Sequence, residues 1–290
     1  MKDIIVIVGP TGIGKTKLSI ALAKKLDAEI INGDSVSIYK ELNIGSAKPT
    51  VEEMEDIPHH LFSICGVNDD YTVYDYQSDV RRVIEDIQNR GKRVIIVGGT
   101  GLYIKAALYD YQFIKEEKKK DYSHLSDEEI REKIKDCSVD IIDIHNRRRM
   151  ERLLQKLENK EAITQGKDNC LYPIKVIGLN TNRDILYDRI NKRVDSMIEN
   201  GLIDEVKSLK KDYLTSRILN SGIGYQEFYD YLYHDKSLEE VINEIKLHSR
   251  HFAKRQFTFF RHQFPTIWFD VNFENFSKTI HDALEICSEN

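Results

Sequence analysis

The chain has 290 residues, 41% of them hydrophobic and 31% charged, so it can bury a substantial core and holds one large domain or two smaller ones. Its net charge of −5 argues against a protein that coats nucleic acid without specificity. No apolar run approaches the roughly 20 residues that a membrane helix needs, and the N-terminus carries no signal-peptide pattern. We therefore expect a soluble, cytoplasmic protein with no membrane partner. The scattered cysteines predict reduced thiols without a metal or disulfide role; they are Cys65, Cys137, Cys170 and Cys287.

The first elements predict a strand, a loop, a helix and a second strand. The continuous apolar run "DIIVIV" at 3–8 is typical of a strand buried on both faces of a parallel sheet, and it stops at Gly9-Pro10. Residues 15–27 place leucines and alanines on one helical stripe, and "AEIINGDS" at 28–35 predicts a strand that ends at Asp34. In such a unit the ligand binds at the carboxyl edge of the sheet.

The loop between the first strand and the helix, "GPTGIGKT", fits the pattern G-x-x-x-x-G-K-[ST] in the context that its mechanism requires. Glycines let backbone amides close around phosphate oxygens, and the helix N-terminus adds a partial positive charge. Lys15 would reach the phosphates, and the hydroxyl of Thr16 would ligate Mg²⁺. The predicted phosphate-binding residues are Gly9, Pro10, Thr11, Gly12, Ile13, Gly14, Lys15 and Thr16.

Asp34 places a carboxylate where an anionic ligand should lie nearby. A metal ligand, a helix cap and a general base all fit this position. An ATPase or GTPase also needs a carboxylate at the end of another strand to hold Mg²⁺. The next buried strand, "RVIIVGGTG" at 93–101, supplies none. The sequence therefore predicts a phosphate site without an obvious apparatus for cutting a nucleotide.

The remaining elements follow in chain order. Residues 73–90 predict a helix that ends at Gly91, just before the strand at 93–101. After Ala107 the sequence becomes polar, and the segments 128–136 and 140–160 look helical with no strand between them. The later elements are a strand at 173–180, helices at 183–200, 202–211, near 225–233 and at about 238–260, a short strand "TIWFD" and a closing helix.

Together these elements predict an α/β fold: a P-loop NTPase-like core, in which a parallel sheet is flanked by helices, plus a small helical insertion domain. We assign residues 1–110 and 173–290 to the core and 111–172 to the insertion.

Two basic clusters interrupt the acidic average. "KLHSRHFAKRQFTFFRHQFPTIW" at 246–268 contains no acid and interleaves basic with aromatic side chains, and "HNRRRMER" at 145–152 is a second cluster. Such composition suits a phosphate backbone and stackable bases. It equally suits a solvated helix face whose phenylalanines turn toward the core.

Several motifs, in order, resemble those of the tRNA dimethylallyltransferases, a family of prenyl transferases that modify the adenosine next to the anticodon. They are "GPTGIGKT" at 9–16, "DSVSIYKELNIGSAKP" at 34–49, "PHHL" at 58–61, "VGGTGLY" at 97–103, "RINKRVDSMIENGLIDEV" at 189–206, "GIGYQEF" at 222–228 and "RHFAKRQFTFFR" at 250–261. Each motif is weak alone, and their order along one chain makes the resemblance specific.

The resemblance implies transfer of a dimethylallyl group from dimethylallyl diphosphate to the exocyclic amine of the adenosine 3′ to the anticodon of tRNA, by a protein that we expect to be monomeric. It implies that Asp34 is the general base, that Thr100 lines the channel where the substrates meet, and that Lys15 and Arg250 bind the diphosphate with Mg²⁺ held at Thr16. The implied tRNA-binding residues are Asp34, Ser35, Val36, Ser37, Thr100, Arg148, Arg149, Met150, Glu151, Arg152, Lys254 and Arg255.

The chain departs from the family pattern at particular positions. Ser37 stands where the family carries a glutamine that reads adenine, Phe259 stands where it carries tryptophan, and "HNRRR" replaces a His-Pro-Asn-Asp sequence. His59 and His60 lack a third ligand in the sequence, so we expect them to be structural or to shape the substrate site.

Two other functions compete with the prenyl transferase. A small-molecule or nucleotide kinase would use the phosphate loop and would need a second catalytic acid. An RNA-binding protein with a degenerate loop would use the basic aromatic segment.

Overall fold

The computed structural model describes residues 2–111, 120–135, 146–159 and 169–288. The chain forms two compact units: Met1–Tyr109 with Cys170–Asn290, and the inserted Asp110–Asn169. From the sequence we predicted the insertion at 111–172. Each unit is described by itself below.

The first unit is built on a sheet of six parallel strands in the order β3-β2-β4-β1-β5-β6. The strands are β1 Ile4–Val8, β2 Ala28–Asn32, β3 His59–His60, β4 Arg93–Gly98, β5 Ile174–Asn180 and β6 Thr266–Asp270. Every residue of β1 and β2 is buried, as expected of strands that helices cover on both faces. The predicted α/β fold is therefore confirmed.

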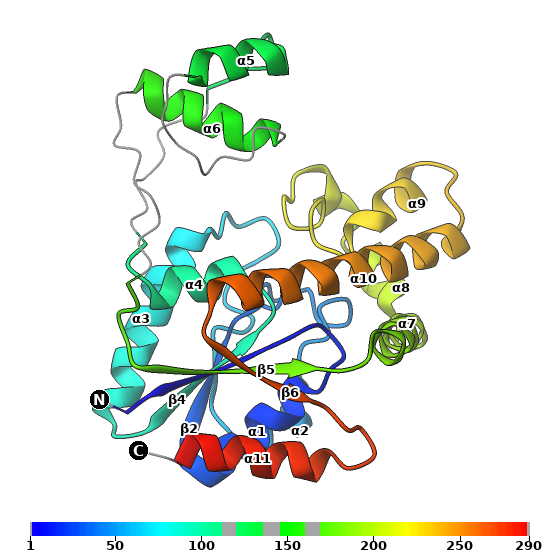
Figure 1. Cartoon of the computed structure of the whole chain (residues 1–290). Coiled ribbons are helices and arrows are strands. Elements are labelled where there is room, and N and C mark those ends of the chain that lie inside the picture. Colours follow the sequence, from blue (N-terminus) through cyan, green and yellow to red (C-terminus); the bar gives the residue numbers. More distant parts are fainter. Residues whose placement is uncertain (1, 112–119, 136–145, 160–168, 289–290) are drawn as a thin grey trace. The chain divides into compact units, whose positions relative to one another are not determined.

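Helices cover both faces of this sheet (Figure 1). Helices α1 Lys15–Leu26 and α11 Phe276–Ser288 pack together on one face, while α3 Val73–Asn89, α4 Gly101–Leu108 and α10 Leu238–Gln263 lie on the other. The long helix α10 also packs on α7 Arg183–Glu199. The shorter helical segments are α2 Val51–Met54, α8 Leu202–Ser208, the 3-10 turns Lys210–Leu214 and Gln226–Phe228, and α9 Tyr229–Tyr233.

Three details differ from the sequence analysis. Strand β2 ends at Asn32, so Asp34 belongs to the following loop, because the Asn32 side chain bonds to the backbone of Asp34 and turns the chain. Strand β3 was not predicted, because its two residues are too few to show the alternating pattern of a strand. Helix α4 escaped prediction because five consecutive residues, 104–108, are buried, which leaves no polar stripe to reveal the helix.

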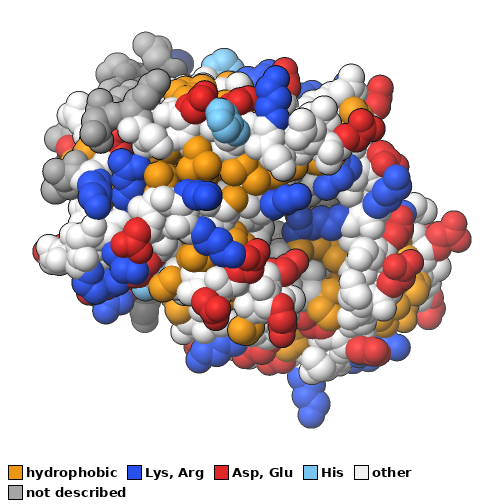
Figure 2. Space-filling model, turned by 90° about the horizontal axis from the view of Figure 1, so that it is seen from below, with side chains coloured by type: hydrophobic (Ala, Val, Ile, Leu, Met, Phe, Trp, Pro, Cys, Tyr) orange, Lys and Arg blue, Asp and Glu red, His pale blue; other side chains and the backbone are white. Residues whose placement is uncertain are grey.

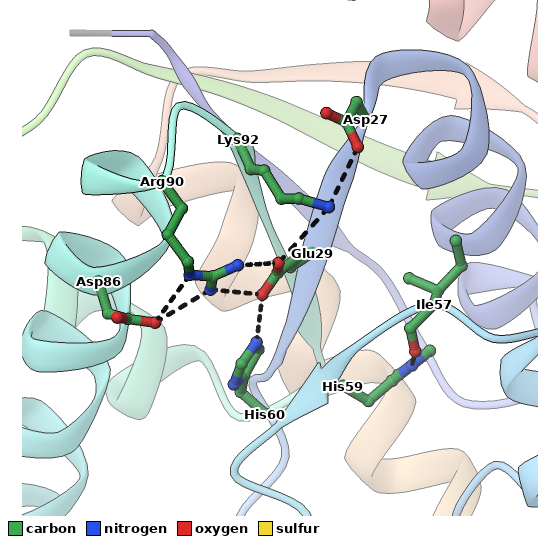
Figure 3. A network of polar contacts seen from close by, with 8 residues as sticks. All are labelled: Asp27, Glu29, Ile57, His59, His60, Asp86, Arg90 and Lys92. Carbon is green, nitrogen blue, oxygen red and sulfur yellow. Dashed lines mark hydrogen bonds and ion pairs between the residues drawn. The ribbon is translucent and has the colours of Figure 1, made fainter.

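A buried carboxylate ties the β2–β3 edge to α3 (Figure 3). Arg90 donates to both oxygens of Glu29, at 2.8 Å for Nη2–Oε2, and His60 Nε2 lies 2.7 Å from Oε2. Hydrogen bonds from Arg90 lower the pKa of Glu29 to about 2, although burial opposes them. His60 is thus a partner of Glu29. His59 points elsewhere, with Nδ1 2.7 Å from the carbonyl oxygen of Ile57.

The inserted unit holds α5 Asp127–Ile134 and α6 Arg147–Glu158, which pack through a small core. That core contains Tyr122, Ile130, Ile134, Met150, Leu153 and Leu154. Ser126 begins α5 with a capping box, and the Asn146 side chain caps α6. The residues 140–145, which we predicted to be helical, lie outside the described residues. Within the described ranges, no helix is long and apolar enough to cross a membrane.

Candidate active site

A cavity of about 940 Å³ opens in the first unit where the strands end. The loops that follow β1, β2 and β4 form one side, and side chains from α7 and α10 form another. Figure 2 shows one face of the molecule, where acidic and basic side chains are mixed and Lys and Arg side chains lie beside a hollow. The parallel sheet therefore gathers its loop residues around one cavity, as α/β folds do at their ligand sites.

The glycine-rich loop, Gly9–Thr16, borders this cavity and leads into α1. Gly14 has a φ of 103°, and a methyl group there would lie 2.6 Å from the ring of Phe276, so only glycine fits. Lys15 Nζ donates to the carbonyl oxygens of Gly9 and Pro10 at 2.9 and 2.8 Å. Burial and, to a smaller extent, the charge of Arg193 lower the pKa of Lys15 to about 7, although Asp34 opposes them. An anion bound beside Lys15 would therefore stabilise the charged form of its ammonium group.

Two arginines one helical turn apart on α7 face the loop. Arg189 donates from Nε to the carbonyl oxygen of Gly12 at 3.0 Å, and its guanidinium lies 3.8 Å from the ring centroid of Phe273. Arg193 lines the cavity with its Nε buried and without a partner. Burial lowers the pKa of Arg193, while Asp34 raises it. A buried N–H donor left unpaired in this cavity is suited to an anionic ligand.

Asp34 lies in a turn that its own neighbours hold. Asn32 Oδ1 accepts a hydrogen bond from the backbone N–H of Asp34 at 2.9 Å, and Asp34 Oδ1 accepts one from Val36 N–H at 2.9 Å. One oxygen of the carboxylate therefore caps the turn. The second oxygen, Oδ2, gives Asp34 an acceptor for a further partner at the cavity that this residue lines.

The exits of β2 and β4 touch because glycines allow it. A methyl group at Gly98 would overlap the backbone of Gly33. Thr100 follows directly, and its Oγ1 accepts from Ser35 N–H at 3.0 Å and donates to Ser35 Oγ at 3.2 Å. The Gly-Gly-Thr run therefore brings Thr100 beside the loop that carries Asp34, and both line the cavity.

Of the other site residues that we predicted in the first unit, some line the cavity and some do not. Ser35, Val36, Ser37 and Arg255 line the cavity, and Ser37 is buried. Arg250 is not among the lining residues; its Nη1 donates to Asn191 Oδ1 at 2.7 Å, and its guanidinium lies 5.9 Å from the ring centroid of Tyr187. Lys254 is exposed on α10. The arginine whose charge acts on Lys15 is therefore Arg193. Arg193 stands in the quoted 189–206 motif, but we predicted no role for it from the sequence.

In the inserted unit, Arg148, Arg149 and Arg152 are exposed on α6. One neighbour that we predicted to contact RNA must be corrected. Met150 is completely buried in the core of this unit, because it lies on the apolar face of α6. Glu151 pairs with Arg147, at 2.8 Å between Oε1 and Nε.

Known proteins of one family are similar to this chain over most of its length. A family model described as IPP transferase matches residues 37–263. The tRNA dimethylallyltransferase of Anoxybacillus flavithermus is 42% identical over 98% of this chain and 95% of its own. That of Bacillus cytotoxicus is 43% identical over 93% of this chain and 90% of its own.

Solved structures give the same result. The tRNA isopentenylpyrophosphate transferase of Bacillus halodurans is similar with a TM-score of 0.76 at 37% identity, covering 99% of this chain and 95% of its own. A eukaryotic dimethylallyltransferase described as acting on tRNA is similar with a TM-score of 0.78 at 27% identity, covering 98% and 78%.

Proposed function

Because the chain belongs to the IPP transferase family of tRNA dimethylallyltransferases, we propose that it transfers a dimethylallyl group from dimethylallyl diphosphate to the exocyclic amine of the adenosine 3′ to the tRNA anticodon. The observation that carries the proposal is that one cavity joins an anion-binding end, with Lys15 and Arg193, to a carboxylate at Asp34. A transfer of this kind needs a leaving anion and a proton acceptor around one carbon atom.

The anion-binding end would hold the diphosphate. As the amine nitrogen attacks the first carbon of the allyl group, the carbon–oxygen bond breaks and its electron pair leaves with the diphosphate. The loop amides, Lys15 and Arg193 stabilise that growing charge more strongly in the transition state than in the bound substrate. Arg193 thereby takes the role that the family resemblance suggested for Arg250.

Mg²⁺ fits the oxygen donors at the same end. Thr16 and Glu53 line the cavity, and hydroxyl and carboxylate oxygens are ligands that this cation prefers. Among the described residues, no three His, Cys or acidic side chains converge on the cavity, which suits a cation that takes its other ligands from water and substrate phosphates. Thr16 would hold the Mg²⁺, which when bound would offset charge on the diphosphate.

Asp34 would remove the proton from the nucleophile. The amine of adenine is weakly nucleophilic because its lone pair is delocalised into the ring, so a base assists as the new bond forms. The proton moves from the amine nitrogen to the Asp34 carboxylate, while Thr100 and Ser35 hold the surrounding loop in place. The adenine must leave the stacked anticodon loop to enter the cavity, as base-modifying enzymes generally require.

The experiment that tests this function uses radiolabelled dimethylallyl diphosphate, Mg²⁺ and unmodified tRNA whose anticodon-adjacent adenosine is flanked by further adenosines. We expect label in the RNA without ATP. A kinase would instead transfer phosphate from ATP and leave the RNA unlabelled, and this outcome would overturn the proposal.

The inserted unit would bind tRNA through α6, where Arg148, Arg149 and Arg152 are exposed. Replacing Arg148 and Arg152 with alanine should weaken tRNA binding and reduce the slope of log affinity against log salt by about 2, because each lost phosphate contact removes about one counterion from the release. The KM for dimethylallyl diphosphate should stay unchanged. Fluorescence anisotropy with labelled tRNA at several salt concentrations measures the slope.

The matched control replaces two exposed lysines at the end of the neighbouring helix α5, Lys133 and the C-cap residue Lys135. It removes the same amount of charge from the same unit and should change the slope less. Equal slopes for the two double variants would contradict the assignment of tRNA contacts to α6.

A further inference from the structure

A glutamine of α10, Gln256, is buried beside the reacting groups. Its side chain lines the cavity, and only 4% of the residue is exposed. Its Nε2 donates to the carbonyl oxygen of Gly99 at 2.9 Å. This bond sets the orientation of the amide, because the flipped amide would place Oε1 against another oxygen acceptor. The amide oxygen therefore faces away from Gly99.

Gln256 Oε1 has no hydrogen-bond partner. Within the described part of the chain, two buried side-chain polar atoms lack one, and they are Gln256 Oε1 and Arg193 Nε. Both residues line the same cavity. An unpaired buried polar atom destabilises the fold, because it has lost its hydrogen bond to water and gained no other, so its presence calls for a ligand that pairs it. Arg193 offers an N–H and suits an anion, whereas Gln256 offers an acceptor and suits a ligand N–H or O–H.

The two atoms suit different groups of the proposed reaction. Arg193 acts electrostatically on Lys15 of the phosphate loop. Gln256 lies toward Asp34, since a methyl group at Gly99 would overlap Gln256 Nε2 and lie 3.9 Å from Asp34 Oδ2. The side chain that carries the unpaired acceptor therefore lies in the same region of the cavity as the carboxylate that we assign to the nucleophile.

We propose that Gln256 Oε1 accepts a hydrogen bond from the exocyclic amine of the target adenine and so selects and orients the nucleophile. The inference rests on the proposed function. The amine carries two N–H groups, of which one would face Asp34 and the other Gln256. Ser37 stands where the family resemblance expects an adenine-reading glutamine, and its side chain is shorter and buried. Gln256 supplies an amide to this region of the cavity from another element.

The test compares binding of two anticodon stem-loop RNAs, one with adenosine at the target position and one with purine riboside, which lacks the amine. Affinities are measured by anisotropy with Mg²⁺ and inorganic diphosphate present. Wild type should prefer the adenosine RNA. Gln256→Met keeps the side-chain length and removes the acceptor, so this preference should fall about tenfold.

Gln77→Met is the matched control. Gln77 is 7% exposed, and its Nε2 donates to the carbonyl oxygen of Ala106 at 2.7 Å, so its loss also removes a buried bond from an amide to the backbone. The melting temperature should fall in both variants, whereas the preference for adenosine RNA should change only in Gln256→Met.

An unchanged preference in Gln256→Met, or an equal loss in Gln77→Met, would overturn the inference while leaving the proposed function intact. Prenyl transfer by the wild-type protein to the adenosine RNA is measured in parallel. If the wild type transfers no label, the proposed function fails, and the inference fails with it.

Discussion

Replacing Asp34 with asparagine should lower the rate constant of prenyl transfer by roughly 100-fold or more, the usual scale for losing a general base. The affinity for diphosphate should stay nearly unchanged, because Lys15, Arg193 and the loop amides remain. Asparagine keeps the oxygen that accepts from Val36 N–H, so the turn keeps its shape. Single-turnover transfer with both substrates saturating measures the rate constant.

Asp34→Ala is the companion variant, because it also removes the bond to Val36. If the basicity of Asp34 is what matters, the rate constant of prenyl transfer should fall by a similar factor in both variants. The two variants should then differ mainly in melting temperature. Loss of diphosphate or Mg²⁺ binding in Asp34→Asn would instead assign the residue to the metal site. Retention of the wild-type rate by Asp34→Asn would exclude it as the base.

Replacing Lys15 with methionine should raise the KM for dimethylallyl diphosphate by about 10- to 100-fold, since hydrogen bonds from a charged donor to phosphate contribute more than neutral ones. Affinity for tRNA should remain largely intact, because the RNA would contact other residues of the cavity and the inserted unit. Isothermal titration with inorganic diphosphate and anisotropy with tRNA separate the two effects.

The same lysine predicts a pH dependence. Burial lowers its pKa to about 7 in the empty cavity, and a diphosphate beside the ammonium raises that pKa. Binding therefore takes up a proton above pH 7, and the affinity of the wild type for diphosphate falls as the pH rises. Lys15→Met should lose this part of the dependence, whereas Lys25→Met, at an exposed lysine of the same helix, should keep it. The prediction fails if Lys15→Met and wild type show the same pH profile.

The strands other than β3, and the glycine-rich loop, could be predicted because their signals are local. A buried parallel strand is a short apolar run, and the loop motif fixes its own geometry through neighbouring glycines. Helix α4 and strand β3 carry no such signal, since one is buried along most of its length and the other has two residues.

That residues line one cavity could be predicted where motif residues follow a strand, as with Lys15, Asp34 and Thr100. The arginine of the distant helix α7 whose charge acts on Lys15 could not be predicted in this way. Arg250 and Arg193 both stand in motifs, and only packing of α7 against α10 decides that Arg193 faces Lys15 while Arg250 pairs with Asn191. A basic residue pair at i and i+4, such as Arg189 and Arg193, was the available signal.

The basic clusters illustrate the same limit at the level of single side chains. Composition cannot tell which face of a helix is buried, so Met150 was grouped with the exposed arginines that flank it. Gln256 is the converse case, because this uncharged residue within a basic segment lines the cavity and has a buried amide oxygen without a partner, which the sequence alone does not reveal.

We propose that one cavity brings the diphosphate and the adenine amine together between Arg193 and Asp34. A crystal structure with a non-reactive thio analogue of dimethylallyl diphosphate and an anticodon stem-loop is the sharpest test of this proposal. We expect diphosphate oxygens on the loop amides, Lys15 and Arg193, and the target amine at about 3 Å from Asp34. An adenine outside this cavity, or a diphosphate remote from Lys15, would contradict it.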